Sequence, residues 1–372
     1  MIRKKVVFFI ESFSGGGAER VLLTVLRNLD MTKFEVTVLV INDCGVYSCD
    51  FHELGVRVVS VLSSSSALLN KIKYKLVYNI LPPELAVKWL LRGIEADTYV
   101  SFIEGYCTKT FARLPKEKRK IAWVHIDLDS FPWTIEKGIY RSKHEEIGDY
   151  QRYDEVIGVS QQVTDMLVDK YGLGSALTIY NPIDENRIKQ LSTAGNPRLD
   201  HSAFNIVSVG RLTRQKGYDR LIGLMPRMLK SNPALRLYII GEGEERQALE
   251  YYIEQLNLQK YVKLLGFSDN PYALMKNMDL FVCSSIAEGF SLVIAEAMIV
   301  GLPVVSMECA GPNELLGNGE YGILCPTFDE LGEAIVKVST DAALMQSLKD
   351  KALERSRYFN TSSTVRQIES IL

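Results

Sequence analysis

The feature that most constrains the fold of this chain is a repeated alternation of short apolar runs with amphipathic stretches. The runs are rich in β-branched and aromatic residues and fall into two series. The first series covers 6–10, 35–41, 56–61, 99–103, 121–125 and 155–160, and the second covers 204–210, 235–240, 262–267, 280–284 and 303–307. Near-continuous apolar strands separated by helices are typical of parallel sheets covered on both faces. Two such series predict an α/β chain with two doubly wound domains.

The length of the chain agrees with two domains. A chain of 372 residues is too long for one comfortable core. The boundary is expected within 180–184, because Asn181-Pro182 disfavours helix and interrupts the strand pattern. We therefore assign 1–182 to an N-terminal domain and 183–352 to a C-terminal domain, and we expect 353–372 to form a helical segment that caps the second domain or crosses back to the first. Ligands of open parallel sheets bind beyond the carboxyl ends of the strands, so the site is expected in the cleft that two such domains face.

Composition excludes several classes of protein. The chain has 47% hydrophobic residues, 24% charged residues and a net charge of −2. This balanced charge does not favour nucleic acid as the main binding partner. The six cysteines form no CxxC pair and the four histidines are scattered, which disfavours structural zinc and agrees with a reducing compartment. The first apolar run is too short for a signal peptide, and no stretch approaches the roughly 20 apolar residues that span a bilayer. We expect a cytoplasmic protein, at most peripheral on a membrane.

Two glycine-rich turns follow predicted strands. They are Gly15-Gly16-Gly17 and Gly241-Glu242-Gly243, and glycines between a strand and a helix let backbone N–H groups approach an anion. Both fail the dinucleotide fingerprint, because Arg20 and Arg246 stand where the third glycine belongs. A dehydrogenase is therefore disfavoured, and a tight turn without a ligand remains an alternative for each glycine run.

Two cations follow the first strand of the second series. Arg211 comes after Gly210 at the strand end, and Lys216 precedes the next helix. A planar guanidinium and a compact ammonium together suit a diphosphate. The alternative is a pair of solvated loop cations.

Two glutamates, Glu288 and Glu296, have seven residues between them near a predicted helix that runs to about Val300. This helix is apolar all round and must be buried, and Glu296 is its only charge. Glu288 precedes the helix, where free N–H groups favour an anion. Eight helical positions would rise about 12 Å, which suits a hydroxyl-rich ligand longer than one sugar ring. The alternative for Glu288 is that it only interacts with the positive end of the helix dipole. The alternative for Glu296 is a buried ion pair with an arginine.

These residues resemble a known family. The segment from Glu288 to Glu296 is similar to the "E, seven residues, E" motif of retaining GT-B glycosyltransferases, family 4 in particular. The resemblance extends over 181–184, 210–217, 237–243, 265–267 and 295–305, and the segment 15–20 is similar to bacterial enzymes that build lipid-linked glycans, capsule or O-antigen. It implies a GT-B fold, with two Rossmann-like domains facing a central cleft. The N-terminal domain would bind the acceptor and the C-terminal domain the nucleotide-sugar donor.

The resemblance also implies roles for single residues. Arg211 and Lys216 would bind the donor diphosphate, Glu296 the ribose hydroxyls, and Glu288 the donor sugar. His125, which ends a predicted strand, would lie against that sugar, although a structural strand-end histidine is the alternative. The remaining donor-binding positions implied are Gly16, Gly17, Gly210, Gly243, Gly266, Phe267, Gly289, Phe290, Ser291 and Leu292.

The reaction implied is transfer of a hexose or N-acetylhexosamine, with retention, from a UDP-linked or similar nucleotide sugar. The acceptor would be a hydroxyl of a glycan, linked to a polyprenyl diphosphate, in cell-surface polysaccharide biosynthesis. The family resemblance implies no metal and no cofactor, since the nucleotide sugar is a substrate. Asp127-Leu128-Asp129 imitates the metal-binding pair of the other major glycosyltransferase fold, and we interpret it as loop. A sugar-nucleotide epimerase and a non-catalytic nucleotide-binding scaffold remain alternatives.

The residues of the segment 68–92 suggest that the protein binds a membrane surface. It interleaves five lysines and arginines with Tyr74, Tyr78 and Trp89 and many aliphatic residues. Basic and aromatic residues beside an apolar face suit an anionic membrane surface, so we expect peripheral contact with the inner face of the plasma membrane. The alternative is an ordinary solvated helix packed on the first sheet.

Overall fold

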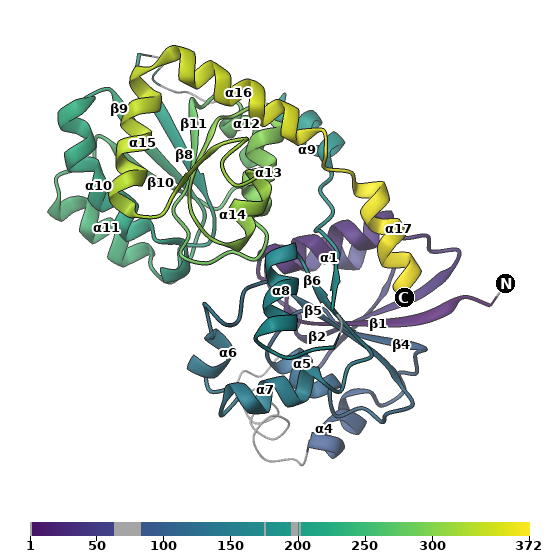
Figure 1. Cartoon of the computed structure of the whole chain (residues 1–372). Helices are drawn as coiled ribbons and strands as arrows, with labels where there is room; N and C mark the ends of the chain where they lie inside the picture. Colours follow the sequence, from purple (N-terminus) through teal and green to yellow (C-terminus); the bar gives the residue numbers. More distant parts are fainter. Residues whose placement is uncertain (1, 63–82, 175, 195–199, 201) are drawn as a thin grey trace. The chain divides into compact units, whose positions relative to one another are not determined.

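A computed structural model describes residues 2–62, 83–174, 176–194, 200 and 202–372. The chain divides into two compact units. The N-terminal unit contains 1–182 together with 362–372, and the C-terminal unit contains 183–361. Each unit is a parallel sheet with helices on its faces (Figure 1).

The N-terminal unit is built on a seven-stranded sheet of order β3-β2-β1-β4-β5-β6-β7, in which every pair is parallel. Its strands are β1 (Lys4–Ser12), β2 (Phe34–Asn42), β3 (Arg57–Ser60), β4 (Thr98–Ser101), β5 (Arg119–Val124), β6 (Glu155–Gly158) and β7 (Leu177–Thr178). The helices are α1 (Gly17–Asn28), α2 (Ser48–Glu53), α4 (Pro83–Leu90), α5 (Tyr106–Phe111), α6 (Trp133–Glu136), α7 (Lys143–Tyr150), α8 (Gln161–Asp169) and α17 (Thr361–Ile371).

The C-terminal unit is built on a six-stranded parallel sheet of order β10-β9-β8-β11-β12-β13. Its strands are β8 (Phe204–Val209), β9 (Leu235–Ile240), β10 (Val262–Gly266), β11 (Leu280–Cys283), β12 (Val304–Met307) and β13 (Ile323–Cys325). Its helices are α9 (Glu185–Ser192), the 3₁₀ turn η2 (Arg214–Lys216), α10 (Tyr218–Ser231), α11 (Arg246–Gln255), α12 (Pro271–Met275), α13 (Leu292–Ile299), α14 (Ala310–Leu315), α15 (Phe328–Thr340) and α16 (Ala342–Ser356).

Both sheets follow from the apolar runs in the sequence. All eleven predicted strands are present, and the prediction of two doubly wound parallel sheets is confirmed. The central strands are buried along most of their length because helices cover both faces. Several strands end one or two residues earlier than predicted, since the apolar run continues into the loop that follows. The sequence analysis missed β7 and β13, which are edge strands of two and three residues.

The last helix belongs to the unit formed by the start of the chain (Figure 1). Within that unit, Glu369 accepts a hydrogen bond from the backbone N–H of Asp30 at 2.9 Å and pairs with Lys33 at 3.2 Å. The hydroxyl of Thr98 donates to the carbonyl of Leu372 at 2.6 Å. On its apolar face Ile368 is fully buried. The chain therefore crosses between units at 182/183 and again at 361/362, and 353–361 stay with the C-terminal unit.

Candidate active site

The strand order of the C-terminal sheet reverses between β8 and β11. From β8 the chain moves outward through β9 and β10, and it returns to place β11 on the other side of β8. The loops after these two strands leave the sheet in opposite directions and open a crevice at the carboxyl edge. Arg211 and Lys216 follow β8, and Glu288 follows β11, so the topology brings the predicted cations and the first glutamate to one place.

Hydrogen bonds tie the two loops together. The hydroxyl of Ser284 donates to the carbonyl of Lys216 at 2.7 Å, and the backbone N–H of Ile286 donates to the carbonyl of Gln215 at 2.8 Å. The side-chain amide of Gln215 donates to the carbonyl of Ala287 at 2.7 Å. The loop after β8 is thus fixed against the loop after β11 without any ligand.

Lys216 and Glu288 form an ion pair across this junction. The hydroxyl of Ser285 donates to the same carboxylate oxygen of Glu288 at 2.7 Å. Burial alone would lower the pKa of Lys216, but the charge of Glu288 outweighs it and the pKa lies above its usual value. The lysine is therefore fully charged at neutral pH and is held in a defined position.

Arg211 lies at the carboxyl end of β8 with an exposed side chain. It stands five positions before the half-buried Lys216. The structure thus brings one exposed and one half-buried cation to the same loop.

Glycines allow this loop to pack closely. A Cβ on Gly210 would lie 2.8 Å from the hydroxyl of Tyr218, and a Cβ on Gly217 would lie 2.4 Å from the carbonyl of Ser284. Gly217 also has a φ of +62°, which an L side chain rarely adopts. These two positions require glycine because a side chain would clash with neighbouring atoms, whether or not a molecule is bound.

The second glycine turn lies beside the first loop. A Cβ on Gly241 would come within 1.9 Å of the carbonyl of Gly210, and one on Gly243 within 2.3 Å of the carbonyl of Leu212. The backbone N–H of Gly241 donates to the carbonyl of Gly266 at 2.8 Å. The predicted donor-binding glycines Gly210, Gly243 and Gly266 therefore lie together, and chain packing accounts for the glycine at each of the first two.

Exposed apolar side chains stand at the end of β10, on either side of Gly266. Leu265 and Phe267 are 45% and 44% exposed, which is unusual for side chains of this size, and Ile286 of the β11 loop is 39% exposed. The segment that holds the predicted donor-binding residues Gly266 and Phe267 therefore presents open apolar side chains at the carboxyl edge of the sheet.

The helix α13 carries the second glutamate. Its residues from Ile294 to Ile299 are buried, whereas Leu292 and Val293 in its first turn are half-buried. The helix ends before Gly301, which has a φ of +82°, and Glu296 is 1% exposed. The hydroxyl of Tyr272, from α12, lies 3.5 Å from Glu296 Oε1. The expected separation of about 12 Å is wrong in its premise, because Glu288 lies in the loop and α13 begins only at Leu292. Four helical positions rise about 6 Å.

Gly289, Phe290 and Ser291 form the turn between Glu288 and this helix. The backbone N–H of Gly311 donates to the carbonyl of Glu288 at 2.8 Å and so braces the turn. Ser291 is the N-cap of α13, yet its hydroxyl makes no cap hydrogen bond. That hydroxyl is buried and has no hydrogen-bond partner among the described residues.

In the N-terminal unit the first glycine run opens α1. Gly15 has a φ of +96°, Gly16 is the N-cap, and Gly17 is the first helical residue. The first N–H groups of a helix have no partner inside it, so this end can bind an anion. The turn follows β1, which lies at the point where the strand order of this sheet reverses.

His125 follows β5, and a hydrogen bond of its imidazole ring holds the side chain in place. Its Nε2 lies 2.9 Å from the carbonyl of Phe102, and burial lowers its pKa to about 4. The imidazole is therefore neutral at neutral pH. Because a carbonyl only accepts, Nε2 carries the proton and Nδ1 is left as an acceptor.

Sequence analysis missed Glu104, which supports His125 from the neighbouring loop. Its carboxylate accepts the backbone N–H of His125 and that of Ile126, the latter at 3.1 Å. The side chain is 3% exposed, and burial raises its pKa to about 7. The only signal in the sequence was an acidic residue and a glycine directly after an apolar run.

Glu11, at the end of β1, is a second residue that the sequence analysis missed. Burial, followed by the nearby charge of Glu19, raises its pKa to about 7. One of its carboxylate oxygens is buried without a hydrogen-bond partner among the described residues. Glu11 and Glu104 therefore both titrate near neutral pH at the carboxyl edge of the N-terminal sheet.

Asp127 and Asp129 lie in the loop after β5. Asp127 accepts hydrogen bonds from the backbone N–H groups of Asp129 and Ser130, at 2.9 and 3.1 Å. Asp129 pairs with Lys143 of α7. Both aspartates thus have structural roles in this loop, in agreement with their interpretation as loop residues.

Two family models match the chain and together cover most of it. The model of Glycosyltransferase Family 4 matches residues 15–187, and the model of Glycosyl transferases group 1 matches residues 195–355. A relative from Campylobacter jejuni is 30% identical over 96% of both chains. It is named N-acetylgalactosamine-N,N'-diacetylbacillosaminyl-diphospho-undecaprenol 4-alpha-N-acetylgalactosaminyltransferase.

Solved structures share the whole architecture. HepE of Anabaena, in complex with UDP and glucose, has a TM-score of 0.78 at 22% identity and covers 99% of both chains. TarM of S. aureus, in complex with UDP, alpha-GlcNAc-glycerol and Fondaparinux, has a TM-score of 0.77 at 14% identity over 99% of both chains. At these identities the likeness concerns the fold.

Proposed function

The chain belongs to glycosyltransferase family 4, with the GT-B fold, and on this premise we propose that it transfers a hexose or N-acetylhexosamine from UDP to a lipid-linked glycan with retention of configuration. The observation that carries the proposal is the Lys216–Glu288 pair at the point where the C-terminal sheet reverses. A fixed cation and a fixed carboxylate at such a crevice suit the diphosphate and the hydroxyls of one nucleotide sugar.

The donor would bind along the carboxyl edge of the C-terminal sheet. Lys216 and the exposed Arg211 would hold the diphosphate, and Glu288, released from Lys216, would accept hydrogen bonds from sugar hydroxyls. Glu296 would take the ribose hydroxyls, with Tyr272 beside it. The base would lie against the exposed apolar surface at Leu265 and Phe267.

Transfer would proceed on one face of the sugar. The acceptor hydroxyl attacks the anomeric carbon on the side that the diphosphate leaves, the bond from that carbon to the phosphate oxygen breaks, and the acceptor proton passes to the departing phosphate. Lys216 and Arg211 would stabilise the negative charge that develops there, without reorganisation at the moment of reaction. Neither glutamate acts as a nucleophile in this scheme, and no metal or cofactor takes part.

The N-terminal unit would supply His125 and the glycine turn. A neutral imidazole with its Nδ1 as an acceptor suits a sugar hydroxyl, and a charged imidazolium would oppose the positive charge that develops on the sugar. The N–H groups of Gly16 and Gly17 would face the diphosphate or the acceptor.

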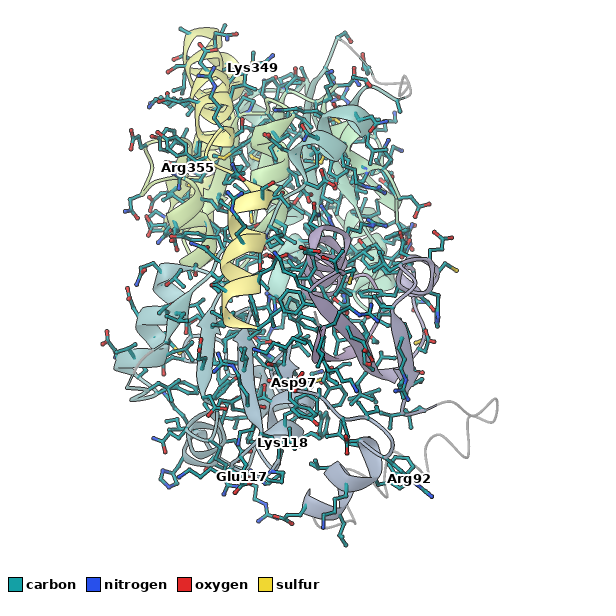
Figure 2. The ribbon with its side chains drawn as sticks, turned by 90° about the vertical axis from the view of Figure 1, so that its right-hand side faces the viewer. Arg92, Asp97, Glu117, Lys118, Lys349 and Arg355 are labelled. Atoms are coloured by element: carbon teal, nitrogen blue, oxygen red, sulfur yellow. The ribbon has the colours of Figure 1, made fainter. Side chains whose placement is uncertain are left out.

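A polyprenyl-diphosphate-linked acceptor is the class that the Campylobacter relative supports by its name. Such a substrate is confined to a membrane, so we also propose that the protein is cytoplasmic and binds the inner face of the plasma membrane peripherally. Among the described residues, no helix has the length and apolarity needed to cross a bilayer. Most of the segment 68–92 lies outside the described residues, but α4 at its end exposes Leu85 and Trp89 beside Lys88 (Figure 2 shows Arg92 just after it).

The decisive experiment supplies the purified protein with a panel of radiolabelled UDP-sugars and polyprenyl-diphosphate-linked glycans, with and without a chelator. We expect label in the lipid fraction only when both substrates are present, an anomeric configuration identical to that of the donor, and unchanged rates in chelator. Conversion of the UDP-sugar to its epimer without acceptor would instead establish the epimerase, and binding of UDP without turnover of any donor would establish the scaffold. Abolition by chelator that Mn²⁺ reverses would contradict the metal-free scheme.

A further inference from the structure

The carboxylate of Glu288 contacts the protein through one of its two oxygens. Lys216 pairs with Oε1, and the hydroxyl of Ser285 donates to the same oxygen at 2.7 Å. The described residues give Oε2 no hydrogen-bond partner, and this oxygen, unlike the hydroxyl of Ser291, is not shielded from solvent. The side chain of Glu288 is 10% exposed. Oε2 is therefore the oxygen that a bound molecule can reach, and a carboxylate oxygen accepts hydroxyl protons.

The two partners of Oε1 differ in charge. Lys216 is a cation, and in the proposed function it also binds the donor diphosphate. A diphosphate carries more negative charge than one carboxylate, so it competes with Glu288 for the lysine. Ser285 is a neutral donor in the same loop as Glu288, and its hydrogen bond does not depend on the lysine. When Lys216 turns to the diphosphate, Ser285 is the partner that stays on Oε1.

The direction of this hydrogen bond is fixed by its chemistry. A carboxylate that is paired with a lysine only accepts, so the hydroxyl proton of Ser285 points to Glu288. The oxygen of that hydroxyl in turn accepts the thiol proton of Cys283, with the sulfur and oxygen 3.5 Å apart. A short chain of hydrogen bonds thus runs from the end of β11 to the carboxylate.

The backbone is tied down on both sides of Ser285. The hydroxyl of Ser284 donates to the carbonyl of Lys216 at 2.7 Å. The backbone N–H of Ile286 donates to the carbonyl of Gln215 at 2.8 Å. Ser285 itself is 3% exposed. Its hydroxyl is therefore in place before a donor binds, and little ordering remains for the binding step.

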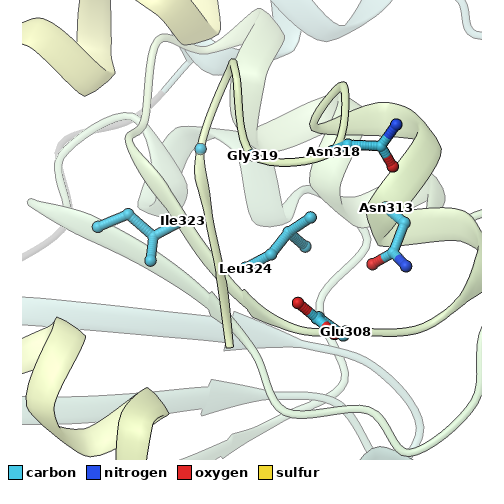
Figure 3. Close-up of a pocket in the computed structure, with 7 residues that line it drawn as sticks. Glu308, Asn313, Asn318, Gly319, Ile323 and Leu324 are labelled. Carbon is cyan, nitrogen blue, oxygen red and sulfur yellow. The ribbon is translucent and has the colours of Figure 1, made fainter. Parts of the chain in front are cut away.

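The loop after β12 also contacts this pair of residues. The Sγ of Cys309 lies 4.0 Å from the carbonyl of Ser285, and the backbone N–H of Gly311 donates to the carbonyl of Glu288 at 2.8 Å. The residue before Cys309 is Glu308, which instead lines an open cavity of about 390 Å³ (Figure 3). The described lining of that cavity includes neither Ser285 nor Glu288. Ser285 therefore acts on Glu288 and not on a molecule in that cavity.

We propose that Ser285 is a positioning residue for the donor sugar, because its hydrogen bond keeps Glu288 turned so that Oε2 accepts a hydroxyl of that sugar. The inference rests on the proposed function and names the group that holds Glu288 once Lys216 binds the diphosphate. Ser285 does not touch the donor. Without its hydroxyl, the carboxylate can rotate toward Lys216 again, so the acceptor for the sugar is lost while the cations for the diphosphate remain.

Binding measurements separate this role from a general effect on the fold. UDP carries the diphosphate without a sugar, whereas UDP-glucose and UDP-N-acetylgalactosamine carry both. Isothermal titration calorimetry of the full chain gives the Kd of each. We expect Ser285→Ala to bind the two UDP-sugars roughly tenfold more weakly, the scale for loss of a hydrogen bond to a charged group. UDP should bind to this variant as it does to the wild type, which also shows that the variant is folded.

Three further variants serve as controls. Ser306→Ala removes a buried hydroxyl of the neighbouring strand β12, which donates to the carbonyl of Met307 at 2.9 Å, and should bind all three ligands as the wild type does. Ser285→Thr keeps the hydroxyl and should restore the affinity for the UDP-sugars. In a Glu288→Ala background, Ser285→Ala should have no further effect on UDP-sugar binding, since the carboxylate that it positions is gone.

Equal losses of affinity for UDP and for the UDP-sugars in Ser285→Ala would show a structural role and overturn the inference. UDP-sugar affinities equal to those of the wild type would overturn it too, as would an effect of Ser285→Ala that persists in the Glu288→Ala background. Failure of the transferase assay has a different signature. The expected difference between UDP and UDP-sugars with no transfer to any acceptor would contradict the proposed function alone. Sugar transfer by the wild type, with unchanged UDP-sugar binding in Ser285→Ala, would contradict this inference alone.

Discussion

Lys216 shows how much a single residue can do before a substrate arrives. Its charge is matched by Glu288, its backbone carbonyl is held by Ser284, and Gly210 leaves room for its side chain. A donor diphosphate would replace one anionic partner by another, so the lysine needs little rearrangement. The desolvation free energy of this partly buried charge is already compensated in the folded protein before the donor binds.

Lys216→Ala should therefore lower kcat/KM by roughly 10²–10³, the scale for loss of one preorganised electrostatic group. The measurement is the rate of sugar transfer at saturating acceptor, with circular dichroism to show that the variant is folded. Lys230→Ala, at an exposed position of α10, is the matched control and should act as the wild type does. Equal rates of sugar transfer in both variants would show that Lys216 is not part of the active site.

Glu104 gives a prediction with a definite sign in pH. Its carboxyl has a pKa of about 7 in the folded chain against 4.5 as the ordinary value, with burial as the main cause. The stabilisation that protonated Glu104 confers is complete below about pH 4.5 and is lost as the pH rises through 7. The wild type should therefore lose roughly 3 kcal/mol of stability over this interval relative to Glu104→Gln.

Denaturant unfolding of both proteins at pH 5 and pH 8, followed by the fluorescence of the tryptophans, measures this difference. Glu146 and Cys107 are close enough to contribute to the surrounding field and remain unchanged in the pair. A constant difference between wild type and Glu104→Gln at the two pH values would mean that the carboxyl keeps its ordinary pKa.

The residues that sequence reasoning found and missed differ in a physical way. Lys216, Glu288 and Glu296 lie in short motifs, so their chemistry is visible along the chain. Glu104 supports His125 only because β4 and β5 are neighbours in the sheet, which brings together loops 21 residues apart. Contacts of this kind depend on strand order, and the sequence pattern does not encode strand order locally.

At the level of elements, the glycine turn after β9 answers a question that the sequence left open. Gly241 and Gly243 pack against the backbone of the loop after β8, so their first role is to let two loops approach. The alternative of a tight turn was correct in this respect. Any role in binding a donor would be added to that packing.

Gly243→Ala should accordingly shift the loop that carries Arg211 and Lys216, because its Cβ would lie 2.3 Å from the carbonyl of Leu212. We expect a lower melting temperature and an increase in KM for the donor. Gly148→Ala, in α7 with nothing within 4 Å of the new Cβ, should instead be neutral or slightly stabilising. Indistinguishable behaviour of the two variants in thermal unfolding and kinetics would show that the loop adapts without cost.

The helix α17 allows a similar test of an element that contributes no residue to the proposed site. Ile368 is fully buried in the N-terminal unit, so Ile368→Ala should cost that unit about 2–5 kcal/mol. Ser370→Ala, on the exposed face of the same helix, should change little. Limited proteolysis at rising temperature would reveal the difference, and equal resistance of the two variants would show that α17 adds no stability.

Element boundaries were predicted to within one residue for long apolar runs such as β2 and β9, and strands of two or three residues were not predicted. The edge strands β7 and β13 have too few residues to produce a run or an alternation. The predicted helix that runs to about Val300 is confirmed, since α13 spans Leu292–Ile299 and Val300 is its C-cap.

At the scale of the whole molecule, the family and the two-sheet architecture followed from the sequence, and the second crossing at 361/362 did not. The proline at 182 marks the first crossing, whereas nothing comparable marks the second. Helical periodicity shows only that 361–371 has an apolar face. It does not show which of two sheets that face covers.

The membrane hypothesis is a property of the whole molecule, and α4 makes it testable. Leu85 and Trp89 are 51% and 43% exposed on a short helix that also carries Lys88. The double variant Leu85→Ser, Trp89→Ser should reduce sedimentation with anionic liposomes at low salt several-fold. Tyr251→Ser, at an exposed aromatic residue of the C-terminal unit, is the control and should sediment as before. Liposome binding by the double variant at the wild-type level would show that α4 does not contact the membrane.

The return of α17 has a consequence for the order in which the protein is made. The ribosome releases residues 1–182 first, but the unit they form lacks its last helix until the intervening 183–361 have been synthesised. At the usual 5–20 residues per second, that interval lasts roughly 10 to 35 s. During it, the apolar side chains that Ile368 and Val365 will cover stay uncovered on the nascent chain. The unit that is translated first is thus completed last, and its need for a chaperone should end when α17 docks.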